Sequence, residues 1–396
     1  MHLSSITTAA LAALLVATPV FVFGQERRAD AVAAEQARKA AEPPAYTPAP
    51  GERLVKAIEN VLYGTPDGFY PYLDSVYSGG GFTGGVGYRD YVGDSTFWDV
   101  KGLYSIKGYK MVEASTASLG LMNGRLALGA RLGWRDATQV GYYGLGPDST
   151  RGERANFGFE QTWAGGDAAF RPAPWFRTEA GLAYEVFAQS PGEGQHPSIE
   201  TVYTPATAPG LGQDPSFVHA SAGMAIDTRR SPGYARSGSL LGATLHSYDD
   251  REGIQSFSRL EVDAIQHIPV LRETWVVSLH GNLNTTLDGD VPYFLMPSVG
   301  GGDSLRGYSS FRFRDRHSLL MQGELRWMPN RYGLDMAIFY DAGTVAPERS
   351  GLSFSNLETN VGIGLRLHSL VATPVRVDLA HGREGMRLVI AGSSSF

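Results

Sequence analysis

Residues 319–327 read LLMQGELRW, and this stretch alternates in polarity with a period of two. The odd-numbered positions are apolar apart from Gly323, and the even-numbered ones include Gln322, Glu324 and Arg326. Successive side chains of a β-strand point to opposite faces of a sheet. The stretch therefore predicts a strand with one apolar and one polar face.

The same alternation recurs on both sides of this stretch, most clearly at 260–264, 334–341, 361–368 and 375–379. Following it along the chain gives fifteen candidate strands, at 77–91, 95–107, 109–120, 123–136, 154–171, 174–188, 216–228, 237–249, 256–268, 274–287, 317–328, 334–345, 357–369, 373–382 and 386–396. The chain is therefore predicted to be all-β.

Unequal connections separate these strands. Short turns such as 330–333 and 369–373 alternate with long polar loops such as 189–215 and 288–316, and aromatic residues stand at strand ends. A soluble sandwich would have more uniform turns, whereas this pattern is typical of a transmembrane antiparallel β-barrel. Such barrels have an even number of strands in bacteria. We expect sixteen, with the missing strand inside 154–171 or before Tyr77.

Composition excludes several classes of protein. The chain has 396 residues, 43% of them hydrophobic and 19% charged, which is too apolar for a disordered chain. After residue 24 no apolar run has the ~18 residues that a spanning helix needs. The net charge of -6 gives no reason to expect a nucleic-acid partner. Because Cys is absent and the nine His are scattered, we expect no metal and no cofactor.

The N-terminus predicts export. Residues 1–24 form a mostly apolar leader with small residues before Gln25, which favours a cleaved signal peptide, although a short membrane anchor is an alternative. Residues 25–68 are predicted to be a periplasmic Ala/Pro-rich linker, and residues 69–396 the barrel domain. At the other end, Phe396 has the parity of Met386, Leu388 and Ile390, so we expect it on the lipid-facing side.

Residues 299–315 read VGGGDSLRGYSSFRFRD, and their core of Leu305, Arg306, Gly307 and Tyr308 resembles the (V/L)RG(F/Y) loop motif of the BamA/TamA outer-membrane family, the bacterial surface antigen superfamily. Further segments are similar to motifs of that family in the family's order: GYYGLG at 141–146, DTR at 227–229 followed by Gly238, FYDAG at 339–343 and GIGLR at 362–366. The resemblance covers about residues 69–396.

This resemblance implies a sixteen-stranded barrel whose long extracellular loop folds into the lumen. The loop's Arg306 would then reach acidic residues on the inner wall, carried here by Glu324 and Asp341. Parity alone places both carboxylates on the polar face, and a guanidinium can hydrogen-bond two carboxylates with fixed geometry. The alternative is that Arg306 only solvates an outer loop. A terminal aromatic such as Phe396 resembles the signal that hands such barrels to the outer-membrane insertion machinery.

The family also implies a function. Residues 25–68 are too short for a POTRA domain, so the chain resembles a short form that lacks these domains. We expect a protein of the Gram-negative outer membrane that assists the insertion or translocation of proteins or lipids without covalent chemistry. Its partners would be outer-membrane lipids and unfolded outer-membrane or secreted clients. A passive pore or lipid conduit is the alternative.

Two motifs suggest chemistry that the fold argues against. Residues 302–305 spell GDSL and residues 378–381 spell DLAH, as in a family of serine esterases. Asp378 and His381 lie three apart in a predicted strand and would face opposite sides, so they cannot serve one serine. The glycines at 79, 81 and 84 match a dinucleotide fingerprint by letters but open no helix. We therefore expect that the protein is not an enzyme.

Overall fold

The computed structural model describes residues 66–396, apart from 254, 272–273, 330–332, 370–371 and 393–395. The expected signal peptide lies outside the described residues, as does almost all of the expected linker, and both stay predictions. Among the described residues, no helix is long and apolar enough to cross a membrane.

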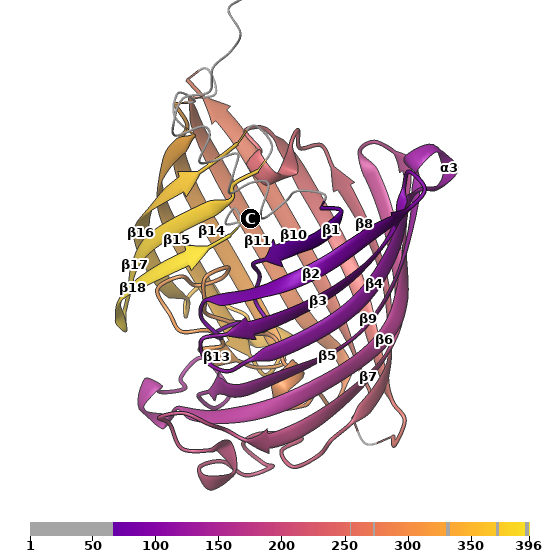
Figure 1. Cartoon of the computed structure of the whole chain (residues 1–396). Helices are drawn as coiled ribbons and strands as arrows, with labels where there is room; N and C mark the ends of the chain where they lie inside the picture. The colour runs from indigo at the N-terminus through magenta and orange to yellow at the C-terminus, as the bar shows by residue number, and fades with distance from the viewer. Residues whose placement is uncertain (1–65, 254, 272–273, 330–332, 370–371, 393–395) are drawn as a thin grey trace, which may run out of the picture. The chain divides into compact units, whose positions relative to one another are not determined.

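In the part of the chain that the structure describes, sixteen strands form a single antiparallel sheet in chain order, as predicted (Figure 1). They are β1 (Gly68–Tyr72), β2 (Thr83–Val92), β3 (Thr96–Ser105), β4 (Lys110–Gly120), β5 (Leu126–Tyr142), β6 (Ala155–Ala173), β7 (Phe176–Pro191), β8 (Ser216–Asp227), β9 (Gly238–Asp250), β10 (Phe257–Val270), β11 (Trp275–Gly289), β14 (His317–Trp327), β15 (Leu334–Ala346), β16 (Glu358–Leu367), β17 (Val375–Gly382) and β18 (Gly385–Ala391). The strand missing from the sequence prediction is β1, which precedes Tyr77.

Short helical turns and one small hairpin complete the described secondary structure. The two-residue strands β12 (Ser298–Val299) and β13 (Phe313–Arg314) pair within the loop that joins β11 to β14. The helical pieces are α3 (Leu121–Gly124), η1 (Arg151–Glu153), η2 (Ile199–Thr201), η3 (Pro232–Tyr234), η4 (Tyr293–Leu295) and η5 (Arg349–Gly351). The loop from 290 to 316 is therefore an ordered hairpin rather than an extended tether.

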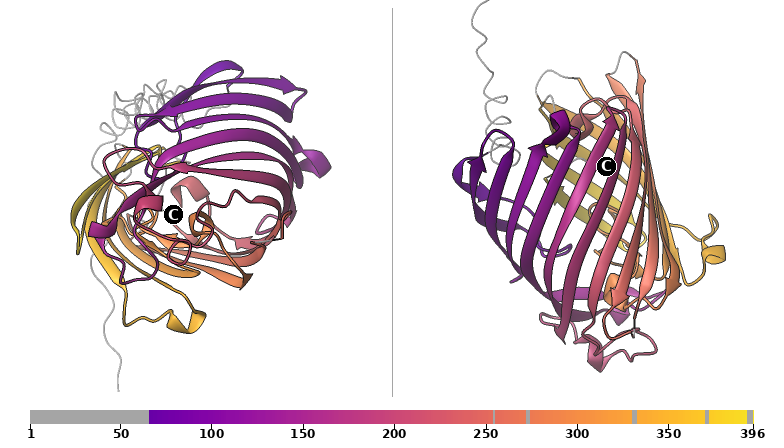
Figure 2. Two further views of the ribbon diagram at one scale, coloured as in Figure 1. Left: turned by 90° about the horizontal axis from the view of Figure 1, so that it is seen from below. Right: turned by 90° about the vertical axis from the view of Figure 1, so that its right-hand side faces the viewer.

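The predicted alternation matches the burial of the strands. In β15, Leu334, Met336, Ile338 and Tyr340 are exposed, while the residues between them are buried. The sheet curls around a lumen (Figure 2). The apolar side chains of β15 are exposed on one face, and its aspartates Asp335 and Asp341 are buried on the other, which lines the lumen. An apolar outer face suits a lipid environment, and the antiparallel ladder satisfies the backbone groups between neighbouring strands. The prediction of a transmembrane barrel is confirmed.

The connections differ at the two rims. Because neighbouring strands are antiparallel, every second connection along the chain, starting with 73–82 between β1 and β2, lies at the same rim. This rim carries the long segments 143–154, 192–215 and 290–316, and we call it the loop rim. A cluster of buried aromatic residues fills the loop rim, contributed by strand ends and by the 290–316 loop: Tyr142, Phe157, Phe159, Phe187, Phe217, Phe257, Tyr293 and Phe294. Several of these rings pack edge to face, for example Phe157 against Tyr293 at 4.8 Å between centroids.

The sheet begins at β1 and ends at β18, and no pairing joins these two strands among the described residues. Figure 1 shows β1 in indigo and β18 in yellow at the two edges of the sheet. Both edge strands are short, with five residues in β1 and seven in β18. We call this unpaired boundary the seam.

The predicted position of Phe396 is wrong. Met386, Leu388 and Ile390 are exposed on the outer face as expected, but β18 ends at Ala391 and Phe396 is not part of it. Its ring instead stacks on His280, with 5.0 Å between the centroids, and lies 5.1 Å from the guanidinium carbon of Arg326. Both are lumen-facing residues, because each alternates with an exposed leucine, Leu279 and Leu325. Parity fails here because Phe396 lies five residues beyond the end of the strand.

Candidate functional site: a charge cluster in the lumen

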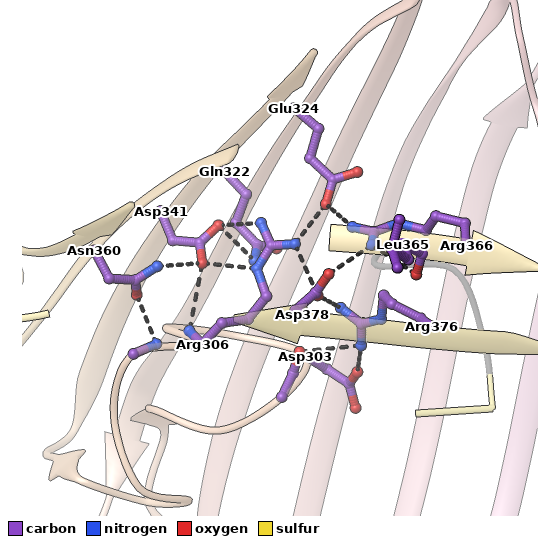
Figure 3. A network of polar contacts seen from close by, with 12 residues as sticks. Asp303, Arg306, Gln322, Glu324, Asp341, Asn360, Leu365, Arg366, Arg376 and Asp378 are labelled. Atoms are coloured by element: carbon purple, nitrogen blue, oxygen red, sulfur yellow. Dashed lines mark hydrogen bonds and ion pairs between the residues drawn. The ribbon is translucent and has the colours of Figure 1, made fainter. Parts of the chain in front are cut away.

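The 290–316 loop folds into the lumen and delivers Arg306 to the inner wall, as the family motif implied (Figure 3). Arg306 is fully buried. Its Nε donates to Asp341 Oδ2 at 2.8 Å and its Nη2 to Asp341 Oδ1 at 2.5 Å. Its Nη1 donates to Glu324 Oε1 and, at 3.3 Å, to Asp378 Oδ2. The arrangement brings together the three residues that the sequence singled out, and the alternative of an Arg306 in solvent is wrong.

The guanidinium also packs against an aromatic ring. The Arg306 guanidinium carbon lies 3.5 Å from the centre of the Phe339 ring, at a depth where both side chains are buried. Burial alone would lower the pKa of Arg306, but the hydrogen bond to Asp341 and the charges of Glu324, Asp341 and Asp378 raise it above its ordinary value. The side chain therefore stays a cation that satisfies several carboxylates at once.

The contacts of Leu305, Gly307 and Tyr308 explain why these residue types flank Arg306 in the loop motif. Gly307 donates its N–H to Asn360 Oδ1 at 3.1 Å, and a Cβ at this position would lie 2.7 Å from Asn360 Cβ. Only glycine allows this close approach to β16. Tyr308 donates its hydroxyl to Glu358 at 2.8 Å, and Leu305 packs in a small apolar cluster with Tyr308 and Phe313. The whole motif is thus packed against the wall.

The sequence prediction missed several members of this site. Glu324 also accepts from Arg326 Nε at 2.6 Å and Arg366 Nη2 at 3.0 Å. Asp378 accepts from Arg366 Nη1 at 2.5 Å and Arg376 Nη1 at 3.2 Å. These residues, together with Asp303 on the loop, form what we call the lumen charge cluster: Asp303, Arg306, Glu324, Arg326, Asp341, Arg366, Arg376 and Asp378. Four arginines face four carboxylates, so the cluster has no net formal charge.

Two neutral side chains complete the contacts of Asp341. Asn360 Nδ2 donates to its Oδ2 at 2.8 Å, and Gln322 Nε2 donates to its Oδ1 at 3.2 Å. Gln322 Nε2 also reaches the backbone oxygen of Ser304 in the loop at 2.8 Å. The loop is therefore tied to β14, β15, β16 and β17, which are the four strands next to the edge strand β18.

Asp303 of the GDSL stretch and Asp378 of the DLAH stretch belong to the lumen charge cluster. Asp378 faces the lumen, whereas His381 is exposed on the opposite face of β17, as the spacing predicted. Ser304 Oγ accepts the N–H of Gly300 at 3.2 Å, and Asp303 pairs with Arg376 at 2.7 Å. Within the described part of the chain, no group of three or more His, Asp or Glu residues is arranged to hold a metal ion.

Deleting the ring at the C-terminus is a direct test of its observed position. We expect Phe396→Ala to lower the stability of the folded barrel by about 1–2 kcal/mol, because the stacking on His280 and the contact with Arg326 are lost. The fraction of protein that runs as the folded band in gel electrophoresis, measured after heating to a series of temperatures, gives the midpoint of unfolding. Phe354→Ala removes an exposed ring from the loop after β15 and is the control. Equal effects of the two substitutions would contradict the lumen position. The role of Phe396 as an insertion signal stays a separate prediction, read from the folded yield.

Residues 195–382 match the Omp85 superfamily domain. The structure is similar to that of BamA from Haemophilus ducreyi lacking POTRA domains 1-3, with 16% sequence identity and a TM-score of 0.60 over 82% of this chain and 69% of that one. It is also similar to CdiB from Escherichia coli, with 13% identity and a TM-score of 0.53 over 82% of this chain and 60% of that one. The chain thus spans less than two thirds of CdiB. No curated protein sequence matches it. At these identities the structural likeness shows the fold alone.

Proposed function

Because the chain carries an Omp85 superfamily domain in a barrel of the BamA/TamA type, we propose that it assists the insertion or translocation of proteins, or of lipids, at the outer membrane. The observation that carries the proposal is the seam. β1 and β18 each have one edge without a partner among the described residues. Unpaired backbone groups are costly inside a bilayer and act as templates for an added strand. A client strand that pairs with either edge would relieve this cost without any covalent step.

The lumen charge cluster supports the proposal because it fixes the loop to β14, β15, β16 and β17 but makes no contact with the edge strand β18 among the contacts described above. The loop binds β14 to β17 through Arg306, Gly307 and Tyr308. The edge strand β18 pairs only with β17 among the described residues. We infer that the cluster keeps the wall beside the seam in shape while β18 exchanges partners.

A reversible cross-link across the seam tests this mechanism. The chain has no cysteine, so Pro71→Cys can be combined in turn with Met386→Cys, Leu388→Cys and Ile390→Cys, all on the exposed face. We expect wild type in lipid vesicles to accelerate the folding of a urea-unfolded eight-stranded barrel. The oxidised double variant should fold this client only at the lipid-only rate, and a reductant should restore the wild-type rate.

The single-cysteine variants under the same oxidation are the controls. An oxidised, cross-linked barrel that still accelerates the client as well as its reduced form would refute the seam mechanism.

A passive pore or lipid conduit is the second candidate, favoured by the polar face that lines the lumen. The packing of the loop rim opposes it, because Phe157, Phe159, Tyr293 and Phe294 are buried against one another there. Planar-bilayer recording separates the two functions. We expect low and irregular conductance, and a stable open channel with fixed ion selectivity would favour the pore.

A further inference from the structure

A basic cavity lies where the seam meets the loop rim, which we call the outer end of the seam. It has a volume of about 230 Å³, enough for roughly eight water molecules at ~30 Å³ each, and three cations line it: Lys107, Arg154 and Arg387. Ser309 and Ser310 of the lumen loop and the hydroxyl-bearing Tyr109 line it as well. The cavity is separate from the lumen charge cluster, with which it shares no residue.

None of the described residues that line this cavity carries a carboxylate. Lys107 Nζ donates to the backbone oxygen of Gly79 at 2.6 Å, and Arg154 donates to the neutral Asn156 Oδ1 at 3.2 and 3.3 Å. Arg387 has no ion pair or hydrogen bond among the described residues. By contrast, each arginine of the lumen charge cluster is paired with at least one carboxylate. Three cations thus share one cavity without a counter-charge.

Burial and the mutual repulsion of these three cations lower the pKa of Lys107. Burial lowers the pKa of Lys107 below its ordinary value, and the charges of Arg154 and Arg387 lower it further. Arg387 points inwards, because its neighbours Met386 and Leu388 are both exposed on the outer face of β18. Like charges gathered in this way destabilise the free protein and favour a bound anion that neutralises them.

Contacts between distant segments bring the three cations together. Arg387 comes from the edge strand β18, Lys107 from the turn between β3 and β4, and Arg154 from the loop before β6. At the same rim, Arg151 Nη1 donates to the Glu384 backbone oxygen at 3.0 Å, and Arg312 pairs with the Glu384 carboxylate at 2.7 Å. The first and last parts of the sheet therefore meet at the loop rim even though β1 and β18 do not pair.

We propose that the basic cavity binds a phosphate group, either free in solution or on the headgroup of an outer-leaflet lipid. A phosphate carries close to two negative charges and three acceptor oxygens, which matches three cations and nearby serine hydroxyls better than a carboxylate would. The volume of the cavity suits one phosphate group rather than a drug-sized ligand, whose pockets start near ~300 Å³. A bound phosphate would join β18 to the loops of the first strands and so hold the outer end of the seam. The proposal does not depend on the function proposed above.

Unfolding in the presence of inorganic phosphate tests the site in the full-length folded protein. Phosphate also stabilises proteins in general through exclusion from their surface, so the readout is the difference between variants at constant ionic strength. Arg125→Gln removes an exposed cation from the turn between β4 and β5 and is the matched control. We expect the unfolding midpoint of wild type and of Arg125→Gln to rise equally with phosphate concentration.

Lys107→Gln and Arg387→Gln should rise less, with the apparent affinity for phosphate weakened about tenfold for each cation removed. Arg387→Lys, which keeps the charge, should recover part of the response. Because Lys107 lies in a turn outside the sheet, Lys107→Gln is expected to fold even if Arg387→Gln does not.

A second arm distinguishes the source of the phosphate. Native mass spectrometry of barrels released from nanodiscs that contain lipid A counts the lipid A molecules retained by wild type and by Lys107→Gln. Retention by wild type alone assigns the cavity to a lipid headgroup. A phosphate response that is weaker in the variants than in wild type, without lipid A retention, assigns the cavity to free phosphate. If Lys107→Gln and Arg387→Gln respond to phosphate as wild type does, and Lys107→Gln retains as much lipid A as wild type, the cavity is not a phosphate site.

Discussion

Arg306→Ala is expected to lower the free energy of unfolding of the barrel by about 3–5 kcal/mol, the cost of leaving buried charges without their partner. The guanidinium is fully buried and contacts Glu324, Asp341 and Asp378. Its removal leaves three arginines to face four carboxylates. The midpoint of unfolding in urea, followed by the mobility difference of the heated and unheated protein, gives the change.

Arg306→Lys is the matched control for this substitution. Lysine keeps the charge but not the planar guanidinium that donates to both oxygens of Asp341, so we expect a partial rescue. If Arg306→Ala costs less than about 1 kcal/mol, the value for an exposed pair, water fills the space around the cluster. That outcome would contradict the role of the loop in bracing the wall.

The fold could be predicted from the sequence because the side chains of a half-buried strand alternate between apolar and polar with a period of two residues. β15 shows the reason most clearly, since its four exposed apolar residues and its buried Asp335 and Asp341 alternate without a break. β1 escaped detection because GFYPY is too short to show a period and contains Pro71. The seam itself could not be predicted as unpaired, because alternation describes the faces of a strand and not its edges.

The site could be predicted only in part. The loop motif identified Arg306, and parity placed Glu324 and Asp341 on the inner face. Parity also places Arg326, Arg366, Arg376 and Asp378 on that face. It does not predict which of these residues contact one another, because contacts across strands depend on register. In the structure Asp378 lies opposite Gly364 of β16, and the absence of a side chain on Gly364 leaves room for Arg366 to reach Asp378. That register is a property of the folded sheet.

The position of the carboxylates along the wall explains why they differ in importance. Asp303 is 80% exposed, and Arg376 is its one ion-pair partner in the described part of the chain, whereas Asp378 is fully buried between Arg306, Arg366 and Arg376. Water solvates the Asp303 carboxylate but not the Asp378 carboxylate. The same substitution at the two residues therefore compares a solvent-exposed carboxylate with a buried one.

Asp378→Asn is expected to destabilise the barrel by about 3–5 kcal/mol, and Asp303→Asn by no more than about 1 kcal/mol. The amide introduced by Asp378→Asn would keep the shape of the carboxylate but would place N–H donors beside guanidinium donors and remove the charge that three arginines share. The double variant Asp378→Asn with Arg376→Gln restores the balance of charge, so we expect it to be more stable than Asp378→Asn alone. Urea unfolding of wild type, Asp378→Asn, Arg376→Gln and the double variant gives the coupling energy between positions 376 and 378. Equal losses from the two aspartates, or no recovery in the double variant, would mean that the cluster acts through shape and not through charge.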